Sequence, residues 1–504
     1  MMRVSINRFA AGHKDGWVIN GSMLRRTALL FVLCWLPLLL SAQRDAFWHF
    51  GDSVVLKWDA SGPVVMPKSA LDGFEASSSM SDTAGNLLFY TNGNRIWNSD
   101  DMPILSGDSL IPSVGQDPMG TMTQGTLVLP FPETPSKYVL VLTGGIPHIR
   151  SLYTVLDMDL NSGLGDLVPG ERRILLDSLG LSEKTTAVRH ANGRDWWVVQ
   201  YRNFEPITGF SDSTFKFYLL SPNGLVYSHA QTIGLDGASF RIGEMVFSED
   251  GSLLGMAGLA GVQVYGFDRC SGLLTEPKMR LGIEGGYGAA FSPNGRFFYF
   301  TTSFKKELYQ YDLLSDGNAD TLSLLGTGTG MLEFGQLQLV MDKKIYMAVN
   351  NLTSNSALSE YLHVINEPDV YGISCDFQPF SFYMDGRIAS GGLPNMVNYE
   401  LGRLEGSPCD TVYAVDTTTT ITTPPLDLDF TVIPTVSDGH YWLDGPSAEG
   451  QSVSAAIYDV NGRLVWQAED WLPLFIDLTG QTAGIYVLRA SRGRHVWNTT
   501  IVLH

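Results

Sequence analysis

The sequence has 504 residues and a formal net charge of −19 at pH 7, with 33 Lys and Arg against 52 Asp and Glu. Nucleic-acid binding needs basic patches, so this acidity argues against a nucleic-acid partner. Glycine (53 residues) and the aromatic residues Trp, Tyr and Phe (11, 20 and 25 residues) are abundant. This composition is typical of tight turns between aromatic-rich strands, so we predict an all-β protein with room for a large core and a second domain.

A secretory signal peptide is predicted in residues 1–42. Met23 opens a segment with two arginines, an apolar run of 14 residues over Thr27–Leu40, and Ala42 as the small residue before the cleavage site. These are the three parts of a signal peptide, so Met23 is the expected true start and the mature protein is expected to be secreted. The run contains Pro37 and is shorter than the roughly 20 residues of a membrane span, so no transmembrane segment is expected in the mature chain.

One short pattern recurs along residues 82–348. A turn-forming stretch, such as Ser292–Gly295, leads into a short apolar run rich in β-forming residues. The six runs are Leu87–Tyr90, Tyr138–Val141, Trp196–Val199, Leu253–Met256, Phe297–Thr302 and Ile345–Ala348. A partner strand is expected after five of them, at Ser151–Leu156, Phe215–Leu220, Val262–Phe267, Leu308–Leu313 and Tyr361–Ile365.

The spacing of these runs predicts the fold. Successive runs begin 44 to 58 residues apart, and periods of roughly 40–50 residues with several strands each are typical of propeller blades. The longer spacings fit loops that grow on one face. The alternative is a pair of β-sandwiches with chance similarity, but sandwiches usually have strands every 8–12 residues or so without a longer period. We therefore predict a β-propeller.

Four segments give residues 45–402 a more specific resemblance: FWHFGD (Phe47–Asp52), SDTAGNLLFYTNGNRIWN (Ser81–Asn98), GFDRCSGLL (Gly266–Leu274) and GGLPNMVNY (Gly391–Tyr399). They resemble an N-terminal propeller that is common in large secreted proteins of Gram-negative bacteria with a type IX secretion system. The resemblance implies about seven blades over residues 43–402 and says almost nothing about function. A seventh blade is expected to close by pairing of a strand near Gly391–Leu401 with the opening strand Phe47–Trp58.

Residues 403–426 are predicted to be a linker, because Asp416–Pro425 is rich in Thr and Pro and cannot build a core. The Asp-Thr-Thr start of this stretch resembles the O-glycosylation sites of the same bacterial group. An unmodified spacer is the alternative.

Residues 427–504 are predicted to form a separate small β domain. Ala455–Trp466 reads as a hairpin with an Asn-Gly turn, and further strands are expected at Phe475–Leu478, Gly484–Arg489 and Thr499–Leu503. These elements resemble the type A C-terminal sorting domain of type IX secretion, which implies an immunoglobulin-like β-sandwich recognised by the secretion machinery. The chain departs from that pattern at Pro434-Thr435-Val436 and at its last residue, His504. An ordinary immunoglobulin-like sandwich is the alternative.

No constellation of reactive residues stands out, so no catalytic, cofactor-binding or metal-binding residue is predicted, and no cofactor. The nine histidines lack zinc-site spacing, and neither a Gly-x-Ser-x-Gly motif nor a phosphate-binding Gly loop is present. His148, His190 and His229 could face a propeller channel, but a single histidine on a β loop is usually structural. Asp316–Asp320 alternates oxygen ligands as a calcium loop does, yet it lacks the downstream Glu, which favours a turn.

Removal of the signal peptide leaves Cys270, Cys375 and Cys409, an odd number for an oxidising compartment. One disulfide and one remaining thiol is the simplest expectation. A Cys375–Cys409 bond would tie the last blade to the segment that leaves the propeller, although the sequence leaves the connectivity open.

Two classes of function remain. The first is a non-enzymatic propeller, secreted or held at the outer-membrane surface of a Gram-negative bacterium, that binds an extracellular protein or glycan and is exported by residues 427–504. The alternative is a propeller enzyme that acts on an extracellular glycan or ester with loop-borne catalytic residues. The strands expected at the channel, Leu87–Tyr90, Val139–Leu142 and Phe297–Phe300, are mostly apolar, which favours binding over chemistry.

Overall fold

The computed structural model describes residues 43–503, except residues 60, 74, 112–121, 145–149, 178–180, 203–212, 235–241, 304, 316–321, 328–331, 352–356, 411–430, 434–435, 438, 445–452, 460–462, 471–473 and 493–494. The predicted signal peptide, most of the predicted linker, His148 and the whole of Asp316–Asp320 therefore lie outside the described residues. In the part of the chain that is described, no helix is both long and apolar enough to cross a membrane.

Seven antiparallel sheets follow one another along residues 47–383 of the described chain. The first two have three strands each: β1 (Phe47–Phe50), β2 (Val54–Asp59) and β3 (Gly62–Val65), then β4 (Ser78–Ser81), β5 (Leu87–Thr91) and β6 (Ile96–Asn98). The third has five: β7 (Thr126–Pro130), β8 (Lys137–Gly144), β9 (Arg150–Asp157), β10 (Asp166–Leu167) and β11 (Ile174–Asp177).

The remaining four sheets have four strands each. The fourth and fifth sheets contain β12 (Leu181–Arg189), β13 (Trp196–Arg202), β14 (Thr214–Ser221) and β15 (Gly224–Thr232), then β16 (Met245–Phe247), β17 (Leu253–Gly258), β18 (Gly261–Asp268) and β19 (Leu273–Leu281). The sixth and seventh contain β20 (Gly286–Phe291), β21 (Phe297–Thr302), β22 (Glu307–Asp312) and β23 (Leu322–Thr327), then β24 (Leu332–Leu339), β25 (Ile345–Asn351), β26 (Tyr361–Ile365) and β27 (Phe377–Tyr383).

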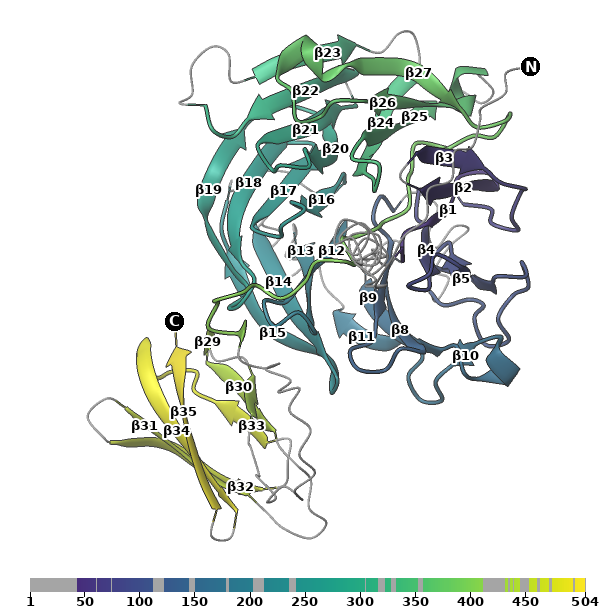
Figure 1. Ribbon diagram of the computed structural model, residues 1–504. Coiled ribbons are helices and arrows are strands. Elements are labelled where there is room, and N and C mark those ends of the chain that lie inside the picture. Colours follow the sequence, from purple (N-terminus) through teal and green to yellow (C-terminus); the bar gives the residue numbers. More distant parts are fainter. Residues whose placement is uncertain are drawn as a thin grey trace, which may run out of the picture. The chain divides into compact units, whose positions relative to one another are not determined.

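These sheets close into a ring, so this part of the chain is a β-propeller with the sheets as its blades (Figure 1). The first strand of each blade contacts the first strand of the next, in the order β1, β4, β7, β12, β16, β20 and β24. Between the last and the first blade, Trp58 of β2 packs edge-on against Tyr346 of β25, with ring centroids 4.7 Å apart. The predictions of an all-β chain and of a propeller are confirmed, and the first strands are the ones that line the centre.

The six apolar runs of the sequence are the second strands of their blades (β5, β8, β13, β17, β21 and β25), and the five partner strands are the third. A second strand is covered by neighbouring blades on both faces, and all six residues of Phe297–Thr302 are buried. The expectation that Leu87–Tyr90, Val139–Leu142 and Phe297–Phe300 line the channel is therefore wrong. The channel is lined by first strands, which carry more polar residues, such as Ser78–Ser81 in β4.

The turn between first and second strands has a repeated construction. In Ser292–Gly295 the Gly295 N–H donates to the Ser292 carbonyl at 2.9 Å, and Gly295 has a φ of 70°. Gly85, Gly193 and Gly251 make the equivalent bond in their blades, with φ values of 80°, 74° and 73°. A left-handed φ favours glycine, which explains why a glycine-containing turn precedes the second strand of each of these blades in the sequence.

The expected closure of a blade by Gly391–Leu401 is wrong. The first blade consists of β1–β3 alone, and residues 388–404, which we call the crossing segment, form no strand. Pro394 has no N–H to donate to a strand ladder. Gly392 passes so close to Glu75 that an added Cβ would lie 2.6 Å from the Glu75 Cα. This close approach holds the segment against the centre of the ring rather than beside β1.

The C-terminal residues form two further sheets. One contains β28 (Thr431–Ile433), β30 (His440–Asp444) and β33 (Leu474–Asp477); the other contains β29 (Val436–Ser437), β31 (Val453–Asp459), β32 (Leu464–Asp470), β34 (Gly484–Arg492) and β35 (His495–Leu503). Tyr441 and Ile476 of the first sheet share one buried core with Ile457 and Leu488 of the second. The pairing of β31 with β32 confirms the predicted hairpin, whose Asn-Gly turn lies outside the described residues.

A disulfide joins Cys270, in the turn between β18 and β19, to Cys409, which follows the crossing segment; the Cα atoms are 5.7 Å apart. Cys375, in the short helix η4 (Gly372–Cys375), is a buried free thiol. One disulfide and one thiol were predicted and are confirmed. The suggested Cys375–Cys409 bond is wrong, because the Cys375 side chain is packed in a core with Tyr299 and Ile345.

Candidate functional site

Five titratable side chains gather at the centre of the ring; we call Glu75, Glu183, Lys184, Glu244 and Tyr287 the central cluster. They come from four blades, just before or near the start of the first strands β4, β12, β16 and β20. Their exposed fractions are 8, 5, 0, 5 and 6% in that order. Because first strands line the centre, residues at their starts are brought together although up to 212 positions separate them in the sequence.

Glu244 links three consecutive blades. Its Oε2 accepts the backbone N–H groups of Ala289 in β20, at 2.8 Å, and of Leu337 in β24, at 2.9 Å. Its own N–H donates to the Tyr287 carbonyl at 2.8 Å. The inner edge of a blade has no further strand to pair with, so a carboxyl group here satisfies backbone donors that would otherwise be buried without partners.

The other members of the central cluster are also bonded to protein groups. The Tyr287 hydroxyl donates to Glu75 Oε1 at 2.6 Å. Glu183 Oε2 accepts both the N–H and the hydroxyl of Thr123, at 3.1 and 2.8 Å. Lys184 Nζ donates to the Ile242 carbonyl at 2.5 Å. Each of these side chains therefore forms its described hydrogen bonds with other groups of the protein.

Burial changes the acid–base behaviour of the central cluster. It raises the pKa of Glu244 to about 8, although the two backbone N–H bonds and Lys184 oppose the rise. Burial, with repulsion from Glu183, raises the pKa of Glu75 to about 7 against the bond from Tyr287. Burial lowers the pKa of Lys184 to about 7, while Glu183 and Glu244 oppose. Loss of hydration disfavours every charged form, so burial shifts these three pKa values towards neutrality, a shift that is also common in acid–base catalysts.

The crossing segment lies against the central cluster and ties the blades together (Figure 1). It is hydrogen-bonded to six of the seven blades. In blade order along the chain, the bonds are Asp52 N–Ile388 O (2.9 Å), Asn395 N–Ser77 O (2.9 Å), Tyr399 Oη–Val128 O (3.0 Å), Asn395 Nδ2–Thr185 O (2.9 Å), Asn398 Nδ2–Glu249 O (2.8 Å) and Gln336 N–Gly391 O (3.2 Å). Because the side chains of the central cluster are at most 8% exposed, a substrate could reach them only if neighbouring groups moved. The arrangement therefore holds the ring together, and it leaves the acid–base groups enclosed.

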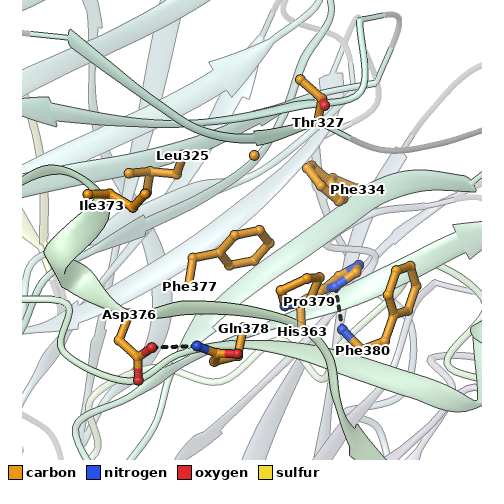
Figure 2. A pocket seen from close by; sticks show the side chains of 11 residues that line it. Leu325, Thr327, Phe334, His363, Ile373, Asp376, Phe377, Gln378, Pro379 and Phe380 are labelled. Atoms are coloured by element: carbon orange, nitrogen blue, oxygen red, sulfur yellow. Dashed lines mark hydrogen bonds between the residues drawn. The ribbon is translucent and has the colours of Figure 1, made fainter.

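A cavity of about 560 Å³ lies at the outer rim, between the sixth and seventh blades; we call it the rim pocket. Its lining is mainly apolar, and Figure 2 shows His363 among the rings of Phe334, Phe377 and Phe380. The full lining is Leu325, Gly326 and Thr327 of β23, Phe334 of β24, His363 of β26, Ile373 and Asp376 at η4, and Phe377, Gln378, Pro379 and Phe380 of β27. It is a cavity of the size and composition of small-ligand sites.

Two of the three histidines considered in the sequence, His190 and His229, lie within the described residues, and each is held by structural contacts in its own part of a blade. His190 Nδ1 accepts the Asn192 N–H at 3.0 Å in the turn before β13, and burial lowers its pKa. His229, in β15, stacks on Phe217 with centroids 4.5 Å apart, and its Nε2 lies 3.2 Å from the Gly272 carbonyl oxygen. Both are structural, as expected. Among the described residues, no group of three or more His, Cys, Asp and Glu side chains is placed to hold a metal ion.

Sequence reasoning missed both the central cluster and the rim pocket. The central residues lie just before or near the start of first strands, whereas the repeated signal in the sequence marks second strands. A search a few residues ahead of each first strand would have found Glu75 and Glu244, but β4 and β16 have only four and three residues and are too short to be recognised. The rim pocket is assembled from three segments of two blades, so no local pattern marks it.

Comparison with known proteins adds little. No family model and no curated protein matches the chain. Among solved structures, it is similar to Hsv2 of Kluyveromyces lactis (TM-score 0.36, 9% identity, 64% of this chain and 90% of that one). It is also similar to the Swd1 β-propeller domain of Myceliophteria thermophila (TM-score 0.38, 12% identity, 62% and 92%) and to a protein from Lactobacillus plantarum (TM-score 0.36, 12% identity, 80% and 96%). These likenesses are too distant to say anything about a ligand or an activity.

Proposed function

We propose that this chain is a non-enzymatic β-propeller, secreted or held at the outer-membrane surface, that binds an extracellular protein or glycan. The observation that supports a binding role over catalysis is the state of the central cluster. Its acid and base groups are buried and hydrogen-bonded within the protein, and the crossing segment packs on Glu75, whereas a propeller enzyme needs such groups open to substrate.

The Cys270–Cys409 disulfide supports export, because structural disulfides persist in oxidising compartments and are rare in the cytosol. The signal-peptide pattern of residues 1–42 points the same way. We further propose that residues 427–504 are a type A sorting domain that directs the chain through the type IX secretion machinery. The separate core of the two C-terminal sheets supports this role, since a sorting signal of this kind has to fold by itself.

The binding role is tested with the purified mature chain from Gln43. We expect no turnover above background on panels of glycosides, esters and peptides, and retention of a defined partner on a glycan or protein array. Lys184→Met, which removes a charge from the central cluster, should leave array binding unchanged. Turnover that disappears in Lys184→Met and in Glu75→Gln, while both variants stay folded by circular dichroism, would contradict the proposal.

One observation favours the alternative of a propeller enzyme acting on an extracellular glycan or ester. Glu75, Glu244 and Lys184 have pKa values shifted towards neutrality, which is typical of catalytic groups. For that function neighbouring groups, such as the crossing segment that packs on Glu75, would have to move. Hydrogen exchange decides this point: backbone amides of residues 388–404 should exchange as slowly as those of the blades if the segment is a fixed part of the ring.

The export role is tested in the native host. Deleting Asp427–His504 should trap a folded propeller in the periplasm, because the address would be lost while the propeller core is untouched. Deleting only residues 411–426 is the matched control and should leave export intact. Localisation is measured by cell fractionation and surface protease treatment. Normal surface amounts of the chain lacking Asp427–His504 would show that these residues are not the address.

A further inference from the structure

The rim pocket contains a buried histidine with an unsatisfied nitrogen. His363 is fully buried, and its Nδ1 accepts the Phe380 N–H at 3.0 Å. A neutral imidazole that accepts at Nδ1 carries its proton on Nε2, and Nε2 has no hydrogen-bond partner among the described residues. Burial lowers the pKa of His363 to about 3, so the ring stays neutral at physiological pH. A buried donor without an acceptor is costly and calls for an explanation.

The backbone around this histidine is irregular. The ladder between β26 and β27 shifts register between Leu362 and Val364, opposite Phe380. Phe380 itself has a φ of 52°, a left-handed conformation that is unusual for a bulky residue. A bulge re-aims side chains, and here it places the Phe380 ring 4.5 Å from the imidazole of His363 (Figure 2). Strain of this kind is retained where the surrounding structure uses it.

The chemistry of the rim pocket selects its ligand. The Phe334, Phe377 and Phe380 rings offer apolar walls that suit another ring, through edge-to-face or offset contacts. A neutral imidazole offers one N–H donor and no charge. Asp376 at the rim and the net charge of −19 disfavour an anion. The room of about 560 Å³ admits a ring with a short polar substituent.

We propose that the rim pocket binds an uncharged ring-shaped group that carries a carbonyl or hydroxyl oxygen, with this oxygen accepting a hydrogen bond from His363 Nε2. Because Nε2 is shielded from solvent, a ligand reaches it only when a neighbouring side chain of the pocket lining moves. The group is either a free small molecule or an aromatic side chain of a polypeptide, since both present the same chemistry. This inference deepens the proposed binding role and rests on it.

The test uses the full mature chain and ligand-observed NMR titrations with three probes. N-acetyl-phenylalaninamide represents an aromatic residue within a polypeptide, and benzyl acetate represents a free neutral aromatic compound. N-acetyl-phenylalanine carries the same ring as the amide but is an anion. We expect a dissociation constant on the order of 0.5 mM for the amide, which has about 15 heavy atoms, and on the order of 4 mM for benzyl acetate, which has about 11. The anion should bind at least ten-fold more weakly than the amide. Binding of the amide alone would assign the site to a polypeptide, and binding of benzyl acetate alone to a free compound.

Two variants localise the binding. Thr327→Trp places a strand-compatible ring in the pocket from β23 and should abolish binding. His363→Phe keeps a ring but removes the donor, and should weaken binding about three- to ten-fold. His49→Phe is the matched control, because His49 is also a buried neutral histidine with an unpartnered ring nitrogen, in the first blade, and should bind as the wild type does.

The outcomes separate this inference from the broader function. The inference is overturned if no neutral probe binds at 10 mM, or if folded Thr327→Trp binds as tightly as the wild type. If Thr327→Trp no longer binds the probes but is still retained on the array, the macromolecular partner binds elsewhere and the rim pocket is a separate site. Loss of array retention with intact probe binding would count against the binding role and not against the rim pocket.

Discussion

Replacing Cys270 and Cys409 with serine is expected to lower the free energy of unfolding of the propeller by about 2–5 kcal/mol. The disulfide closes a loop of 139 residues, and a cross-link over so long a loop removes much conformational entropy from the unfolded chain. It also fixes the end of the crossing segment to the fifth blade. Calorimetry of the double variant should therefore show a melting temperature several degrees below that of the wild type.

Two controls accompany this experiment. Cys375→Ala removes the buried free thiol and should lower the free energy of unfolding by only about 1 kcal/mol, because a single heavy atom, the sulfur, is lost from the core. A reducing agent should lower the melting temperature of the wild type and of Cys375→Ala but not that of the double serine variant. Equal melting temperatures for the double variant and the wild type would show that the crossing segment is held by its hydrogen bonds alone.

The sequence was most informative about the strands that are covered on both faces. Phe297–Thr302 and its equivalents are continuous apolar runs because each second strand packs between neighbouring blades. Their spacing reports the repeat, so the propeller could be predicted. First strands such as Met245–Phe247 have three residues, and outer strands such as Leu322–Thr327 are partly exposed, so neither has a pattern to recognise.

The candidate sites could not be predicted because their residues are joined only by the ring. Glu75 and Tyr287 share a hydrogen bond across 212 positions, and nothing near either residue in the sequence indicates the other. The sequence predicts a strand near Gly391–Leu401, whereas Pro394 and the close packing of Gly392 on Glu75 keep this stretch out of any strand. The sequence does not indicate Cys270 as the partner of Cys409 for the same reason, because the two residues lie close together only in the closed ring.

Glu244→Leu is expected to destabilise the propeller by about 2–5 kcal/mol, whereas Glu244→Gln should be tolerated. Leucine leaves the N–H groups of Ala289 and Leu337 buried without an acceptor, and each such group costs about 1–3 kcal/mol. Glutamine keeps one oxygen at the same place, which accepts both bonds. Chemical denaturation of the two variants at pH 6 measures the difference, and equal stability of the variants would show that the carboxyl group does not hold the blades.

Glu244→Gln should also change how stability depends on pH. The folded pKa of Glu244 is raised to about 8 from 4.5, mainly by burial, so the folded protein keeps a proton that the unfolded chain loses. A raised carboxyl pKa contributes stability that is complete below pH 4.5 and is lost as the pH rises through 8. The variant has no such proton, so its stability relative to the wild type should increase by about 2 kcal/mol between pH 5 and pH 7. Glu75 titrates in the same way in both proteins, whereas the charges of Glu244 and Lys184 are coupled, so the difference between the two curves reports Glu244 together with its effect on Lys184. A difference that stays constant over this range would mean that Glu244 is ionised in the folded protein, and that its carboxylate is stabilised by Lys184 more strongly than burial disfavours it.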